Sequence, residues 1–145
     1  MKKIVISILT FSILVILPGC NSRQTVYQPE GTIIIDSQDY LMIPGDYSWK
    51  EKEMELTTLS TYDIEELAEQ FETLEVVKNN ILTFEITKSP SSISVTQYHE
   101  DGTSKVIETT NNQITMPNTS GTYIYEVKAR WPEGKINFVF DVNVK

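Results

Sequence analysis

The chain has 145 residues, enough for one domain and a short additional segment. Its composition, 40% hydrophobic and 22% charged, is that of a globular protein and excludes a disordered or collagen-like chain. The formal net charge of −8 disfavours nucleic acid and anionic lipid head groups as partners of the folded body. Basic ligands and divalent cations remain electrostatically possible, as does an acidic surface that only keeps the protein soluble.

The first twenty residues have the three parts of a signal peptide: two lysines, an apolar run over Ile4–Leu17, and the ending "LPGC". Fourteen helical residues cover about 21 Å, less than the roughly 30 Å of a hydrocarbon core, so a stable membrane span is not expected. The segment before Cys20 also lacks the A-x-A arrangement of an ordinary secretory cleavage site.

Leu17, Gly19 and Cys20 resemble a bacterial lipobox, with Pro18 at a position where a small residue is usual. The resemblance implies that residues 1–19 are removed and that Cys20 is acylated, for example with palmitate. It therefore implies a protein anchored in the lipid bilayer on the extracytoplasmic face of the cell membrane. Cys20 is the single cysteine of the chain, so the alternatives are a buried structural residue, an intermolecular disulfide or a free thiol.

Residues 20–30 are polar and include Pro29, which predicts a flexible tether. We expect one domain over residues 31–145. Its first part contains three short runs typical of strands, at Thr32–Ile35, Tyr47–Lys50 and Glu55–Leu59.

The segment "DIEELAEQFETL" predicts one short amphipathic helix over about residues 63–72. Its apolar residues recur at helical spacing, and its glutamates face away from that stripe. Asp63 and Glu66 have the spacing of a capping box. We expect this helix to lie across an opening between two sheets.

The remainder alternates with the period of strands. "ILTFEIT" and "SISVTQY" are separated by a Ser-Pro turn, and shorter runs follow at Lys105–Glu108 and Gln113–Thr115. The last 25 residues form two alternating runs around Pro132-Glu133-Gly134, which predicts an antiparallel hairpin with one buried face. Eight or nine short strands with one helix predict a mainly β protein, a sandwich or a barrel.

"SGTYIYEVKARW" resembles the late strand of immunoglobulin-like domains, with Gly121 and Tyr123 matching and Tyr125 at the usual cysteine position. In that family the tyrosine often makes a corner hydrogen bond, so the resemblance implies one for Tyr123. That resemblance implies an immunoglobulin-like antiparallel β-sandwich without a disulfide, in which Trp49 takes the place of the core tryptophan. The whole chain is similar to small uncharacterised lipoproteins of Gram-positive bacteria such as bacilli, whose motifs specify a fold rather than an activity.

The sequence contains no recognisable combination of catalytic residues and no group of residues spaced as metal ligands. With Cys20 assigned to lipid and His99 the single histidine, one chain cannot assemble a thiolate or imidazole metal site, and no cofactor is expected. His99 is expected to be a solvated turn residue rather than a catalytic one. The glutamates of the predicted helix are expected to be a solvated face rather than a glycosidase pair. Loop acids at Glu100-Asp101-Gly102 and Asp36-x-x-Asp39 are weak calcium candidates.

The large aromatic residues are expected to pack in the core, with a sugar- or peptide-stacking strip as the alternative; they are Trp49, Tyr123, Tyr125 and Trp131. If the domain binds a ligand, exposed loops are the expected place. The candidate ligand-binding residues are His99, Glu100, Asp101, Arg130, Trp131 and Glu133.

These observations favour a non-enzymatic, membrane-anchored binding or interaction module, whose partner is an unknown protein or wall ligand. Two alternatives remain. Arg130-Trp131-Pro132 is similar to a loop of chagasin-like peptidase inhibitors, with Trp and Pro in the opposite order. A small glycan-active wall enzyme using carboxylates such as Glu66 and Glu69 is the other.

Overall fold

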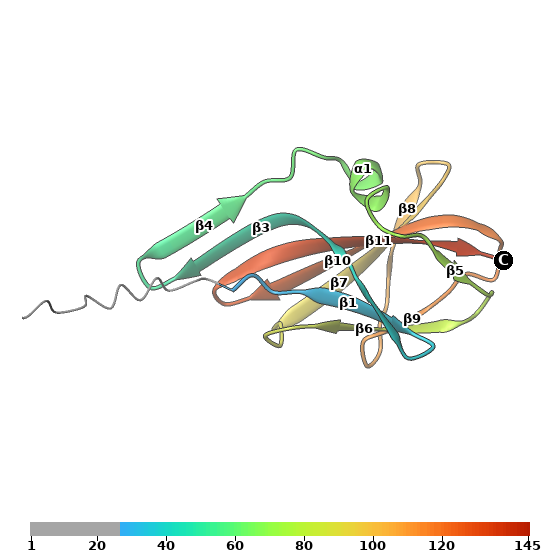
Figure 1. Ribbon diagram of the computed structural model, residues 1–145, viewed down its shortest axis with the longest axis horizontal. Helices are drawn as coiled ribbons and strands as arrows, with labels where there is room; N and C mark the ends of the chain where they lie inside the picture. Colours follow the sequence, from blue (N-terminus) through green and yellow to red (C-terminus); the bar gives the residue numbers. More distant parts are fainter. Residues whose placement is uncertain (1–26) are drawn as a thin grey trace, which may run out of the picture.

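The computed structural model describes residues 27–145, which form two packed β-sheets and one short helix (Figure 1). The protein is a mainly β sandwich, as the sequence predicts. The predicted signal peptide and Cys20 lie outside the described residues. The strands are β1 (Gly31–Ile35), β2 (Gln38–Leu41), β3 (Ile43–Glu51), β4 (Met54–Thr58), β5 (Leu74–Val76), β6 (Ile81–Ile86), β7 (Ser92–His99), β8 (Ser104–Ile107), β9 (Gln113–Thr115), β10 (Gly121–Trp131) and β11 (Gly134–Val144).

The described residues thus contain eleven strands, where the sequence predicts eight or nine. The additional two are β2 and β5. The small sheet has the order β2-β1-β6-β9, and the large sheet has the order β4-β3-β11-β10-β7-β8, with β5 pairing in parallel with β11. The chain crosses between the sheets after β2, β5, β6, β8 and β9. This places β1-β6-β9 opposite β7-β10-β11, a strand order that corresponds to immunoglobulin-like sandwiches.

The two sheets are joined where β2 continues into β3 at Met42. The backbone N–H of Met42 donates to the carbonyl of Gly31 at 2.9 Å. A Cβ on Gly31 would lie 2.5 Å from Cε of Met42 and about as close to the Phe138 ring, so glycine permits this close approach.

The β10–β11 hairpin is the centre of the large sheet, and its register runs from Gly121↔Val144 to Trp131↔Gly134. Alternate residues of both strands point into the core, which confirms the predicted buried face. The Tyr125 ring stacks on Phe140 with centroids 5.0 Å apart, and Trp49 meets Trp131 edge to face at 5.4 Å. The core-packing interpretation of the large aromatics is therefore confirmed.

The hydroxyl of Tyr123 donates to the backbone carbonyl of Thr119 at 3.0 Å. This is the corner hydrogen bond that the resemblance implies for Tyr123. Trp49, in contrast, belongs to β3 rather than to a strand of the central β7-β10-β11 group. Its ring nevertheless lies in the same core cluster.

The helix α1 covers Ile64–Ala68, shorter than predicted, and begins with the predicted capping box of Asp63 and Glu66. It does not lie across an opening of the sandwich: Leu67 and Ala68 pack on Val139, on the outer face of the large sheet. The expected position is wrong because the apolar residues of this segment pack on two different surfaces: Leu67 on the outer face of the sheet and Phe71 in the core. Phe71, after the helix, points into the core and packs edge to face on Phe140, with ring centroids 6.1 Å apart.

The sandwich has two distinct ends. The tether end contains residues 27–30, the β3–β4 turn, the β6–β7 loop and the β10–β11 turn (Figure 1). The far end contains the β1–β2, β5–β6 and β7–β8 turns and the β9–β10 loop. Within residues 27–145, no helix is long and apolar enough to cross a membrane.

Candidate functional site on the outer face of the large sheet

The candidate ligand-binding residues lie at opposite ends of the sandwich and cannot form one site. His99 pairs with Tyr123 at the far end, whereas Arg130 pairs with Ser92 at the tether end. Seven residues along β10 separate these two pairs, which corresponds to about 24 Å at about 3.4 Å per residue.

His99 is the last residue of β7, where the strand enters the β7–β8 turn as the sequence predicts, but its side chain is half-buried rather than solvated. Its ring packs edge to face on Tyr123, with centroids 5.4 Å apart. The hydroxyl of Tyr125 donates to Oε1 of the buried Gln97, which directs the Gln97 amide nitrogen to Nε2 of His99 at 3.2 Å. His99 therefore closes the far end of the core.

Glu100 and Asp101 occupy the β7–β8 turn, and both make local hydrogen bonds. Oε1 of Glu100 accepts from the backbone N–H of Thr122 at 3.2 Å. Oδ1 of Asp101 accepts from the N–H and the hydroxyl of Thr103, and these bonds lower the pKa of the exposed Asp101 carboxyl. Asp101 thus stabilises the turn.

Arg130, Trp131 and Glu133 surround the β10–β11 turn and differ in accessibility. Arg130 and Glu133 are exposed, whereas Trp131 is 8% exposed, and its Nε1 donates to the Lys88 carbonyl at 2.7 Å. An inhibitor loop must display its side chains to a protease. The buried indole therefore gives the chagasin-like interpretation no support.

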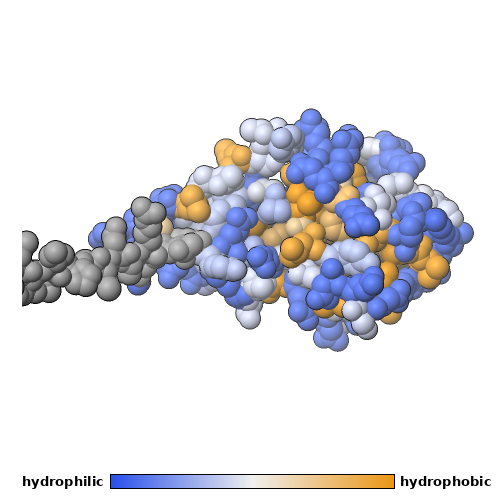
Figure 2. All heavy atoms as spheres, viewed as in Figure 1, coloured by the Kyte–Doolittle hydropathy of each residue, from blue (hydrophilic) through white to orange (hydrophobic). Residues whose placement is uncertain are grey.

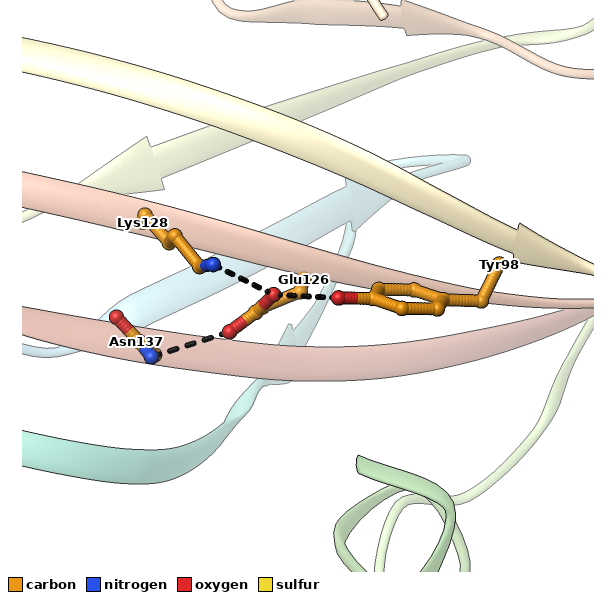
Figure 3. Close-up of polar contacts among 4 residues, drawn as sticks. All are labelled: Tyr98, Glu126, Lys128 and Asn137. Atoms are coloured by element: carbon orange, nitrogen blue, oxygen red, sulfur yellow. Dashed lines mark hydrogen bonds and ion pairs between the residues drawn. The ribbon is translucent and has the colours of Figure 1, made fainter. Parts of the chain in front are cut away.

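A polar cluster that sequence reasoning did not identify lies on the outer face of the large sheet (Figure 3). Oε2 of Glu126 accepts from the Tyr98 hydroxyl at 2.9 Å and meets Nζ of Lys128 at 3.2 Å. Oε1 of Glu126 accepts from Nδ2 of Asn137 at 3.0 Å. Three adjacent strands, β7, β10 and β11, contribute these residues, so the cluster joins the middle of the sheet.

Glu126 is surrounded by hydrogen-bond donors and one ammonium group. The residue is 9% exposed, and three donors compensate its removal from water. Burial, with the hydrogen bond to Glu126 second, raises the pKa of Tyr98 to about 12, so this hydroxyl remains a donor at neutral pH. Both carboxylate oxygens of Glu126 bind donors from the sheet, so the cluster holds three neighbouring strands together beside the site.

A hollow of about 270 Å³ opens beside this cluster, between α1 and the end of β7. Ile64 and Ile124 provide apolar walls, while Glu65 and Glu100 come from the helix and the β7–β8 turn. The remaining lining residues are Tyr98, His99, Gly102 and Thr122. Figure 2 shows hydrophilic side chains over the α1 region and hydrophobic ones gathered below it.

A second, smaller hollow of about 110 Å³ lies on the other side of the helix, where Ile64 and Glu126 contribute to the lining. Oδ1 of Asp46 accepts from the backbone N–H of Ser60 at its border, which holds the segment before α1 against β3. The two hollows share Ile64, so the position of the helix determines the shape of both.

Asp141 is a second buried acid on the outer face. It is 8% exposed; Oδ2 accepts from the Thr73 hydroxyl at 2.8 Å, and Oδ1 has no hydrogen-bond partner. Burial raises the pKa of this carboxyl against the opposing effect of the Thr73 bond. Asp141 thus ties the segment after α1 to β11.

The helix glutamates have structural or solvated positions. Oε2 of Glu66 accepts from the Asp63 backbone N–H at 3.1 Å, and Glu65, Glu69 and Glu72 are exposed. Over residues 27–145, no three histidine, cysteine or acidic side chains gather as metal ligands would.

The chain matches no protein-family model, no curated protein and no solved structure.

Proposed function

We propose that this protein is a lipoprotein anchored through Cys20 on the extracytoplasmic face of the cell membrane, and that its β-sandwich is a non-enzymatic binding module. The lipobox-like letters Leu17 to Cys20 support the anchor. A sandwich whose first strand begins at Gly31 supports a folded body held close to the membrane by a short tether.

The observation that carries the binding role is the 270 Å³ hollow. It brings His99 and Glu100, two of the candidate ligand-binding residues, together with Ile64 and Glu65 of α1. Apolar walls with a few polar groups at the rim are typical of ligand sites. Residues displayed at strand ends can change without disturbing the sheets that hold them.

The acids around the hollow favour binding over catalysis. Glu126 is held by three protein donors, Glu66 caps the helix, and Glu100 accepts from a backbone N–H. A general acid or base must be free to exchange a proton with substrate. The ligand of this module is a protein or a wall component that meets the far end of the domain.

Anchoring is tested by labelling cells with a palmitate analogue and fractionating their membranes. Wild-type protein should carry the label and remain with membranes, and Cys20→Ala should lose both because the acylated thiol is absent. Membrane retention of the unlabelled variant would contradict the lipobox interpretation.

The hollow is tested by cosedimentation with isolated cell walls. Glu65→Arg should reduce binding by about tenfold or more, because it fills the rim and reverses its charge; ΔΔG of about 1.4 kcal/mol corresponds to tenfold. Glu72→Arg makes the same charge change on an exposed residue outside the lining and should leave binding unchanged. Equal losses in both variants would show that net charge matters and that the hollow does not.

A further inference from the structure

Two basic side chains are placed directly opposite each other on the large sheet. Arg130 of β10 and Lys135 of β11 are in register, both are exposed, and neither makes a salt bridge within residues 27–145. Like charges at directly opposite positions are destabilising. Residues 27–145 contain 20 acidic and 9 basic side chains, so this pair of bases contrasts with the overall acidity of the domain.

Two further lysines lie on the same face. Lys128 precedes Arg130 by two residues on β10, and Lys50 follows Ser48, the β3 partner of Lys135, by two residues. Both have acidic neighbours: Lys128 meets Glu126, and Lys50 lies 3.9 Å from Glu55. We call Lys50, Lys128, Arg130 and Lys135 the basic cluster; within residues 27–145, Arg130 and Lys135 are its members without a salt bridge, although Glu133 lies in the turn between them.

The basic cluster lies at the end where the chain enters the domain. The backbone N–H of Thr87 donates to the carbonyl of Glu30. The carbonyl of the following residue, Lys88, accepts from Nε1 of Trp131, so residue 30 lies close to the β10–β11 turn. Seven residue steps from Cys20 to Tyr27 span at most about 25 Å when fully extended. An acyl chain on Cys20 would therefore keep this end of the sandwich near the head groups.

The two ends of the domain differ in their balance of charge. At the tether end, exposed acids and bases are equal in number: Glu30, Glu51, Glu53, Glu55 and Glu133 against Lys50, Lys52, Lys88, Arg130 and Lys135. Around α1 and the β7–β8 turn the exposed charges are mainly acidic, at Asp63, Glu65, Glu66, Glu69, Glu72, Glu100 and Asp101. The negative net charge of the domain therefore comes largely from the region away from the tether. At physiological salt, interactions between exposed charges fade beyond about 8 Å, so a nearby surface responds to the local cluster rather than to the distant acids.

We propose that the basic cluster binds the phosphate groups of anionic phospholipids and so orients the domain, with the hollow facing away from the membrane. This inference rests on the proposed lipid anchor. Guanidinium groups form paired hydrogen bonds with phosphate oxygens, and an adjacent ammonium adds charge. The expectation that anionic lipid repels the folded body thus holds for the net charge but not for the tether end.

The experiment uses the full lipidated protein in vesicles of phosphatidylcholine, with or without phosphatidylglycerol. Ser94→Cys supplies a free thiol on an exposed residue that pairs with Lys128, and energy transfer from a dye there to a head-group dye reports docking. Transfer should rise when phosphatidylglycerol is present and fall again at high salt. Each basic residue near an anionic surface raises the binding constant about fivefold. The double variant R130Q/K135Q should therefore reduce the ratio of docked to undocked protein about 25-fold.

The matched control is K78Q/K105Q, which removes the same charge from exposed lysines of the β5–β6 turn and β8. It should retain the response to phosphatidylglycerol. Equal losses in both double variants, or no response of the wild type to phosphatidylglycerol, would overturn the proposal. Thermal unfolding of R130Q/K135Q should match that of the wild type, because both residues are exposed.

Two other results have separate meanings. Failure of the labelled protein to float with any vesicle would reject the anchor of the proposed function rather than the basic cluster. If a soluble phosphate polymer binds Arg130 and Lys135 while phosphatidylglycerol has no effect, the surface belongs to a wall polymer and the membrane proposal is wrong.

Discussion

The inner and outer faces of β10 differ sharply, although their residues alternate along one strand. The inner residues are aromatic or aliphatic, and all are buried: Tyr123, Tyr125, Val127, Ala129 and Trp131. The outer residues change along the strand from Ile124 under the helix, through the compensated Glu126, to the exposed Arg130. The inner face of β10 thus has one role, which is packing. Its outer face has three sections: a section covered by α1, a section whose side chains form hydrogen bonds with neighbouring strands (the bonded section), and an exposed section.

This difference indicates where function can reside. Inner positions are constrained by close packing, so substitution there changes stability first. Outer positions are constrained by specific polar partners or by none. Substitutions on the two faces should therefore separate stability from binding.

The largest expected effect is on the inner face. Trp131→Ala should lower the free energy of unfolding by about 3–5 kcal/mol, because it leaves a cavity beside Trp49 and a carbonyl of Lys88 without its donor. Denaturant unfolding measures the change. Tyr27→Ala, at a 68% exposed aromatic, is the control and should change stability by less than about 0.5 kcal/mol. A similarly small change at Trp131 would contradict its assignment to the core.

A smaller effect is expected at the bonded section of the outer face. Glu126→Ala should cost about 1–3 kcal/mol, because Tyr98 and Asn137 lose their acceptor in a half-buried position. Glu126→Gln keeps the shape and should lower the pKa of Tyr98 from about 12 without reaching the ordinary value, because burial is the larger cause. Ultraviolet titration follows this hydroxyl. An unchanged Tyr98 titration in Glu126→Gln would show that the two groups do not interact in solution.

The smallest expected effect is a pH-dependent one at Asp141. The folded state raises the pKa of this carboxyl, so protonation favours folding. Its contribution is fully present below the unfolded pKa of about 3.9 and is lost as pH rises through the folded value. The stability of Asp141→Asn relative to wild type should therefore increase from acid to neutral pH. A difference that is constant over this range would mean that the pKa of the Asp141 carboxyl is the same in the folded and unfolded states.

The parts of the fold that depend on neighbouring residues could be predicted from the sequence. The β10–β11 hairpin follows from alternation on both sides of a Pro-Glu-Gly turn. The capping box follows from Asp63 and Glu66 at the required spacing. The hydrogen bond of Tyr123 follows from the immunoglobulin-like pattern, because its acceptor, the carbonyl of Thr119, is only four residues away in the sequence.

Weak local signals explain the strands that were missed. β1 and β2 are joined by Asp36 and Ser37, both with positive φ, where the usual sequence signal is a glycine. β2 itself, "QDYL", is mostly exposed and polar. β5 has three residues, and its pairing with the end of β11 depends on β3 leaving that edge. Such a strand is defined by its partner rather than by its own sequence.

The outer-face site could not be predicted for the same reason. Tyr98, Glu126 and Asn137 are far apart in sequence and meet through the register of β7, β10 and β11. The regular alternation predicts that each points outward, but it does not say which of them become neighbours. The division of the helical stripe between Leu67 and Phe71 depends likewise on which sheet surface is free.

The position of β11 has a consequence for how the protein acquires its structure. This last strand of the described chain pairs with β10 on one side and with both β3 and β5 on the other. β3 can therefore complete its pairing only with residues nearly one hundred positions later in the chain. Contacts between residues so far apart in sequence make folding slow, in the range of about milliseconds to seconds. The central sheet therefore cannot be completed until residues 134–144 are available to pair with the strands on both sides.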